Sequence, residues 1–123
     1  MANPFVHLEL QTNDVAKAKA FYSKLFGWQL EDVPMPGGYT YTMIKVGEGT
    51  GGGMMQSQAP GGEPSHWLAF VGVEDIAATM KKARELGAEV IMDVTKVADF
   101  GMGSIFKDPT GAVLALWQPL KKK

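Results

Sequence analysis

The chain of 123 residues has the length of one ordinary domain and is too short for two independent cores of usual size. Hydrophobic residues make up 46% of it and charged residues 20%, which is typical of a globular protein and excludes a disordered, collagen-like or coiled-coil chain. The 12 basic and 13 acidic residues give a net charge of −1, so the composition offers no electrostatic footprint for nucleic acid or for an anionic membrane.

The first part of the chain predicts a strand, a helix and three further strands. Over 5–11, aliphatic side chains alternate with aromatic or polar ones, and a period of two is typical of a half-buried strand. Asn13 or Asp14 is a suitable N-cap for a helix over 15–26, whose apolar residues recur at helical spacing. Turns rich in proline and glycine separate the next expected strands, over 28–33, 39–46 and 53–58.

The second part of the chain predicts the same order again. A strand is expected over 66–73, and Asp75 is a suitable cap for a helix that Gly87 stops. Three strands follow, over 89–94, 100–106 and 112–118. The last two flank Asp108-Pro109-Thr110-Gly111, which has the composition of a tight turn.

The repeated order indicates an internal duplication within a single domain over 1–123. We expect module one over about 1–58, a linker over 59–65 and module two over about 66–120. The linker holds two prolines and two glycines, which favour irregular backbone. An unrelated α+β sandwich with two helices is the alternative.

Five short segments carry a resemblance to a known family. They include Phe-Tyr and Leu-Phe-Gly-Trp within 20–28 and Asp-Pro-Thr-Gly within 106–111, together with residues 7–14 and the pair of segments 73–76 and 86–88. In this order and spacing, the chain resembles the vicinal oxygen chelate superfamily over nearly its whole length. That superfamily includes glyoxalase I, extradiol dioxygenases, fosfomycin-modifying enzymes and bleomycin-binding resistance proteins.

The resemblance implies an α+β fold in which two βαβββ modules form curved mixed sheets round a central cup. The alternation in the first strand agrees with this fold. Val6, Leu8 and Leu10 are expected to pack beneath a helix, while His7, Glu9 and Gln11 point into the cup. A face of this polar kind suits a small-molecule site better than a core.

Family enzymes that use a metal hold it with one side chain from each of four strands. His7 matches the first of these positions, whereas Leu68 and Ala115 stand at two others and cannot ligate. In the remaining strand Gln56 is the nearest polar residue. One matching ligand is too few for a divalent ion, so we expect no metal at the family positions.

A rearranged metal site is the alternative. His66 lies two residues from Leu68, on the same face of the expected strand, and joins His7 and Glu9 in a set of two histidines and a carboxylate. If chemistry occurs, His7 and Glu9 are the catalytic candidates, since an imidazole titrates near neutral pH and a carboxylate can act as a base.

Ligand-binding candidates are the residues that the resemblance places at the cup, and aromatic side chains among them could stack on a flat ligand. They are His7, Tyr41, Gln56, Leu68, Phe70, Phe100, Ala115 and Trp117, with Phe106 and Tyr39 as further aromatic residues. Aromatic residues in strands also serve as core, which is the competing interpretation.

The expected function is glyoxalase-like or bleomycin-resistance-like binding of a small organic molecule, aromatic ones included, without the usual four-ligand metal site. The alternative is a metal-dependent lyase or dioxygenase-type enzyme that uses His7, Glu9 and His66. The resemblance also implies a homodimer, and we expect no nucleic-acid or membrane partner. The chain has no cysteine, no apolar stretch near the roughly 18 residues of a membrane span and no signal pattern, which favours a cytoplasmic location.

Overall fold

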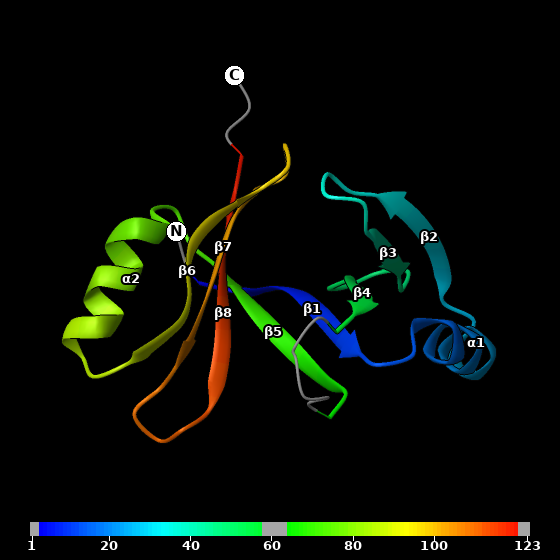
Figure 1. The fold of residues 1–123 in the computed structure, drawn as a ribbon, viewed down its shortest axis with the longest axis horizontal. Helices are drawn as coiled ribbons and strands as arrows, with labels where there is room; N and C mark the ends of the chain where they lie inside the picture. Colours follow the sequence, from blue (N-terminus) through cyan, green and yellow to red (C-terminus); the bar gives the residue numbers. More distant parts are fainter. Residues whose placement is uncertain (1–2, 58–63, 121–123) are drawn as a thin grey trace. The chain divides into compact units, whose positions relative to one another are not determined.

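The computed structural model describes residues 3–57 and 64–120, and its elements run in the predicted order (Figure 1). They are β1 Phe5–Thr12, α1 Val15–Phe26, β2 Gln29–Pro34, β3 Thr40–Lys45, β4 Gly52–Gln56, β5 His66–Gly72, α2 Ile76–Glu85, β6 Glu89–Val97, β7 Gly101–Lys107 and β8 Val113–Pro119. The α+β class, with strand, helix and three strands occurring twice, is confirmed. Most of the predicted linker, over 59–63, lies outside the described residues.

The contacts of the chain divide it into two units, and each is described by itself. The first unit covers 7–68, and the second joins the residues up to Val6 to those from Ala69 onward. In the second unit, Gly72 of β5 donates its N–H to the carbonyl of Pro4 at 2.9 Å. Asn3 donates its side-chain N–H to the carbonyl of Gly72, also at 2.9 Å.

The strands of the first unit lie in the order β2-β3-β4-β1, and those of the second in the order β6-β7-β8-β5. In both units the first strand pairs in parallel with the last, and the two remaining pairings are antiparallel. The two sheets therefore have the same mixed topology, which is what an internal duplication predicts. In Figure 1 each helix lies against one side of the strands of its own unit.

Each helix covers a small apolar core. Beneath α1 the buried residues are Leu10, Ile44 and Met54, with Tyr22 and Trp28 among the side chains that pack round them. Beneath α2 they are Val73, Ile76, Met80 and Leu116. Each helix thus covers one face of its sheet, and the opposite face has no helix of its own unit against it.

Both helices begin at the predicted aspartate. Asp14 accepts from the backbone N–H of Lys17 at 3.0 Å, and Asp75 accepts from that of Ala78 at 3.0 Å, so each carboxylate satisfies a donor that has no partner within its helix. Gly27 follows α1 with φ 69°, a left-handed conformation that glycine adopts without steric cost.

Strand ends differ from the predictions by a few residues, most of all at β6, which extends to Val97 instead of Val94. The register between β6 and β7 shifts twice, between Val90 and Met92 and between Met92 and Thr95. Such irregularities interrupt the strict period of two, and this is why the sequence pattern understated the length of β6. No helix in the described part of the chain is both long and apolar enough to cross a membrane.

Candidate functional site

The open face of the first unit's sheet carries a hydrogen-bonded polar cluster of His7, Glu9, Gln11 and Tyr41. The first three alternate along β1 with Leu8 and Leu10, and Leu10 packs beneath α1, so they lie on the opposite face, as the sequence predicted. Val6 and Leu8 are each 39% exposed, so the prediction that they pack beneath a helix is wrong. Glu9 is only 9% exposed, which is unusual for a carboxylate. The cluster is the strongest candidate for a functional site in the first unit.

Tyr41 of β3 connects two residues of the cluster through one hydroxyl. It donates to Oε1 of Glu9 at 2.9 Å, and its oxygen lies 2.6 Å from Nε2 of His7. A phenol carries a single proton, which Tyr41 gives to Glu9, so the Nε2–H of His7 donates to Tyr41. This network assigns the His7 tautomer that carries its proton on Nε2.

Gln11 completes the cluster from the far side of Glu9. Its side-chain N–H donates to Oε2 of Glu9, so each oxygen of the carboxylate accepts a hydrogen bond from a neighbour. Each oxygen keeps further capacity to accept. The cluster is therefore rich in hydrogen-bond acceptors.

Burial dominates the electrostatics of the cluster. It raises the pKa of Glu9, although the hydrogen bonds from Tyr41 and Gln11 and the nearby charge of His66 act in the opposite direction. It lowers the pKa of His7 and so favours the neutral imidazole. Burial and the adjacent Glu9 carboxylate also raise the pKa of Tyr41, which stays a neutral hydrogen-bond donor.

The side chains at the family's metal positions do not fit a divalent ion. Leu68 is 4% exposed and Ala115 is fully buried, and neither carries a donor atom. Among residues 3–57 and 64–120, no three His, Asp, Glu or Cys side chains form a group that could hold a metal ion. His66 lies in an exposed position, with its Nδ1 3.0 Å from the carbonyl oxygen of Pro64, so the structure does not gather it with His7 and Glu9 into such a group.

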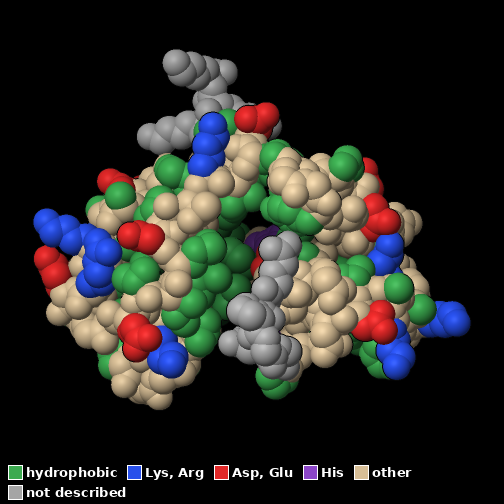
Figure 2. Space-filling view, in the orientation of Figure 1, with side chains coloured by type: hydrophobic (Ala, Val, Ile, Leu, Met, Phe, Trp, Pro, Cys, Tyr) green, Lys and Arg blue, Asp and Glu red, His purple; other side chains and the backbone are tan. Residues whose placement is uncertain are grey.

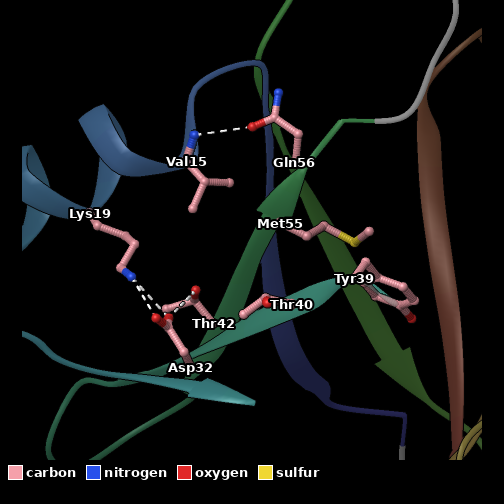
Figure 3. A pocket seen from close by; sticks show the side chains of 8 residues that line it. All are labelled: Val15, Lys19, Asp32, Tyr39, Thr40, Thr42, Met55 and Gln56. Atoms are coloured by element: carbon pink, nitrogen blue, oxygen red, sulfur yellow. Dashed lines mark hydrogen bonds and ion pairs between the residues drawn. The ribbon is translucent and has the colours of Figure 1, made fainter. Parts of the chain in front are cut away.

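Gln56 is directed away from the cluster, toward the start of α1. Its side chain donates to the carbonyl of Asn13 at 2.6 Å and accepts from the N–H of Val15 at 3.3 Å. There it borders a separate groove of about 390 Å³ (Figure 3), which also contains the ion pair between Lys19 and Asp32 at 2.8 Å. The structure therefore does not bring Gln56 together with the other polar candidates.

The open face of the second unit's sheet is apolar. Phe70 of β5 and Trp117 of β8 meet edge to face with ring centroids 6.5 Å apart, and Ala115 is two residues along β8 from Trp117. Phe70 pairs with Ala115 in the strand register. Figure 2 shows hydrophobic side chains gathered over β5 and β8, with charged side chains mostly farther out. The structure thus places these three candidates together on one face.

Two aromatic residues lie elsewhere. Phe100 precedes β7 and is 54% exposed. Phe106 was expected to line the cup, and this prediction is wrong, because the residue packs against the core beneath α2. It pairs in the register with Leu114, so it shares the face of Ser104 and Leu116 and not that of Ile105.

Sequence reasoning missed one residue of this site, Gly53 of β4. It lies opposite Glu9 in the register, directly beneath the Tyr41 ring, as the close approach of an added Cβ shows. The signal in the sequence was the glycine that opens the strand expected over 53–58, to which we assigned no role in the site.

Comparison with known proteins places this geometry in context. The sequence model of the Glyoxalase/Bleomycin resistance protein/Dioxygenase superfamily matches residues 5–116. The chain is 40% identical over 114 residues to CFP32 of Mycobacterium tuberculosis, named as a glyoxylase, and the match covers 90% of this chain and 44% of that protein. It is 31% identical over 123 residues to the anthracycline biosynthesis protein DnrV of Streptomyces peucetius, covering 89% and 45%. The chain thus spans less than half the length of these relatives.

Solved structures show the same fold at low sequence identity. A protein from Bacillus halodurans C-125 aligns with a TM-score of 0.76 at 16% identity, over 100% of this chain and 99% of that one. Methylmalonyl-CoA epimerase from Mycobacterium tuberculosis aligns with a TM-score of 0.72 at 15% identity, over 95% and 88%. At this level of identity the likeness concerns the fold alone.

Proposed function

This chain belongs to the Glyoxalase/Bleomycin resistance protein/Dioxygenase superfamily, and from that premise we propose that it binds a small organic molecule through the cluster of His7, Glu9, Gln11 and Tyr41. Binding on this face does not use the family's four-ligand metal site. The ligand carries a hydrogen-bond donor, such as a hydroxyl or an amine, that faces Glu9.

The observation that carries the proposal is the buried Glu9 carboxylate. Burial of a charge is unfavourable unless partners compensate it, and the partners here are the neutral groups of Tyr41 and Gln11. In the described part of the chain, no Lys or Arg forms an ion pair with Glu9. A ligand donor would therefore gain a charge-assisted hydrogen bond, which is stronger than a neutral one.

The apolar face of the second unit, taken by itself, is a separate surface for an aromatic or conjugated molecule. Phe70 and Trp117 meet there edge to face, and Phe70 is only 8% exposed, so Trp117 is the ring of this pair that a flat molecule would contact. The first screen therefore contains hydroxyl and amino compounds for the polar cluster and, separately, aromatic compounds for this face.

The test is a thermal-shift screen of such compounds followed by calorimetry on each hit. A specific ligand raises the melting temperature, and Glu9→Gln weakens its binding about tenfold, since one charge-assisted hydrogen bond contributes on the order of 1.4 kcal/mol. Glu31→Gln is the matched control, because Glu31 is an exposed carboxylate on β2 of the same sheet. A complete screen without a hit, or a hydroxyl or amino hit insensitive to Glu9→Gln, contradicts the proposal. For the apolar face of the second unit the separate test is Trp117→Ala, which should abolish the shift caused by an aromatic hit.

A metal-dependent glyoxalase-type or dioxygenase-type enzyme with His7, Glu9 and His66 is the competing hypothesis, which the 40% identity to a protein named as a glyoxylase favours. Calorimetry with nickel, zinc, manganese and iron(II) separates the two. Tight stoichiometric binding that His7→Ala abolishes would support the enzyme, and silence with every ion would count against it.

We also propose that two copies of the chain pair through α1. This helix has no buried residue, whereas α2 buries Ile76 and Met80. Phe21, Leu25 and Phe26 of α1 are each more than half exposed, and large apolar side chains that lie together at a surface favour association. A symmetric dimer brings the same patch of both copies together.

A further inference from the structure

The Tyr41 ring reaches its partners by crossing a neighbouring strand. Tyr41 belongs to β3 and its hydroxyl meets His7 and Glu9 of β1, while β4 lies between these strands in the sheet. At the crossing point β4 contributes Gly53, which pairs with Glu9 on one side and with Met43 on the other. The ring therefore passes over β4 at a residue that has no side chain.

The space above Gly53 is filled by this ring. A Cβ added at Gly53 would lie 2.1 Å from Cε2 of Tyr41 and 2.3 Å from both its Cζ and its hydroxyl oxygen. Non-bonded carbon atoms pack at about 3.5–4.0 Å, so a methyl group and the ring cannot occupy this space together.

The backbone of Gly53 does not itself require glycine. Its φ lies outside the left-handed region, in contrast to the loop residues Gly47 and Gly49, whose φ values are 92° and 105°. Alanine could adopt this strand conformation without strain. The three atoms nearest to an added Cβ all belong to Tyr41, so its side chain is the first obstacle to any larger residue at position 53.

We propose that Gly53 is a positioning residue, whose missing side chain lets the Tyr41 ring lie across β4 and hold His7 and Glu9 in one fixed hydrogen-bonded arrangement. The inference deepens the proposed function, and the claim that this arrangement selects the ligand rests on it. His7 and Glu9 are two residues apart on a strand, and their side chains rotate independently unless a third group joins them. The Tyr41 hydroxyl is that group, so Gly53 determines the pattern of donors and acceptors that a ligand meets.

The experiment follows the imidazole signals of His7 by NMR in the ligand-free protein. The chain has two histidines, so His66→Gln assigns the signals without ambiguity. In Gly53→Ala the ring must leave, and the hydrogen bond from Nε2 of His7 is lost. We expect the His7 signals to shift in the same direction as in Tyr41→Phe, which keeps the ring and removes the hydroxyl.

Two controls separate positioning from a general effect of replacing a glycine in a strand. Gly103→Ala introduces a Cβ whose nearest neighbour, Cε3 of Trp117, is 3.6 Å away, an ordinary contact, and should leave the His7 signals unchanged. In a Tyr41→Ala background no ring remains to collide, so adding Gly53→Ala should produce no further shift of the His7 signals. This double variant also provides a folded comparison if Gly53→Ala alone folds poorly.

The proposal is overturned if the His7 signals of Gly53→Ala match those of the unsubstituted protein, or if Gly53→Ala shifts them equally in the Tyr41→Ala background. Neither result depends on a ligand. Failure of the compound screen would therefore contradict the proposed function alone, and failure of the NMR experiment would contradict only the positioning role of Gly53.

Discussion

The Glu9 carboxyl is the side chain in which burial and charge conflict most directly. The structure removes it from water and compensates it with two neutral donors, from Tyr41 and Gln11. The outcome is a raised pKa, which means that the folded chain binds this proton more strongly than the unfolded chain does. Functional sites often hold groups with shifted pKa values, because ligand recognition and stability place different demands on the same atoms.

This raised pKa predicts a pH-dependent stability difference between Glu9→Gln and the unsubstituted protein. At neutral pH the charged Glu9 lowers the free energy of unfolding. Acidification through its raised pKa toward the ordinary value of 4.5 relieves that cost. Gln cannot titrate, so the stability of Glu9→Gln relative to the unsubstituted protein should be greater at pH 7 than at pH 4.5.

Urea denaturation of both proteins across this pH range measures the difference. His7 titrates in both proteins, and subtracting one curve from the other removes its contribution. A difference in unfolding free energy that stays constant with pH would show that the Glu9 pKa is not raised in the folded chain.

Strand β4 shows how two adjacent glycines serve different purposes. At Gly52 an added Cβ would lie 1.9 Å from the carbonyl oxygen of Leu8, which is backbone of the paired strand β1. At Gly53 the obstacle is the end of a side chain, which can rotate away. Gly52 allows β4 to pair with β1, and Gly53 leaves room for the Tyr41 ring to lie across β4.

Gly52→Ala should therefore destabilise the fold much more than Gly53→Ala. The backbone of β1 cannot move without breaking its pairing with β4, so we expect a loss of at least about 3 kcal/mol in the free energy of unfolding. Thermal or chemical denaturation of the two variants measures this, with Gly103→Ala as the tolerated reference. Equal stability of the Gly52 and Gly53 variants would refute the distinction.

The two helix caps give a matched pair of element-level predictions. Asp14→Ala and Asp75→Ala each remove an acceptor at 3.0 Å from a backbone N–H in the first turn of their helix. Each should cost about 1 kcal/mol of unfolding free energy, the usual value for such a cap. Substitution by Asn should recover most of it, because an amide oxygen also accepts. If Asn recovered nothing, charge rather than hydrogen bonding would be the cause.

For the molecule as a whole, the two units share one topology but differ in how much apolar surface their helices expose. Both units have the same strand order and an aspartate cap, yet α1 has no buried residue and leaves large apolar side chains exposed, whereas α2 buries Ile76 and Met80. Ring contacts join Tyr22 of α1 to Trp28 and Trp67, so the exposed surface continues beyond the helix. This asymmetry is the basis of the proposed pairing through α1.

Sedimentation at micromolar concentration tests the pairing. We expect a dimer, which Phe21→Ser together with Leu25→Ser converts to a monomer, since each change removes apolar area from the contact. Leu86→Ser is the control, because Leu86 is an even more exposed apolar residue, at 69%, that follows α2. A monomeric unsubstituted chain, or a dimer unaffected by the α1 changes, contradicts the proposal.

Much of the fold could be predicted because its signals are local. The period of two over β1, the capping aspartates and the stop glycines act on neighbouring residues, so the order of the elements, the α+β class and the face shared by His7, Glu9 and Gln11 follow from the sequence by itself. Family membership was also predicted, since its motifs are short and contiguous.

Only the tertiary structure decided which distant side chains meet. The contact of Tyr41 with His7 joins residues 34 positions apart, and the turn of Gln56 toward Asn13 joins residues 43 apart. Both contacts depend on the register between strands. A shift of one residue would turn these side chains to the other face of the sheet, and no local pattern encodes the register. The need for glycine at position 53 arises in the same way, because its steric neighbour is a ring from another strand.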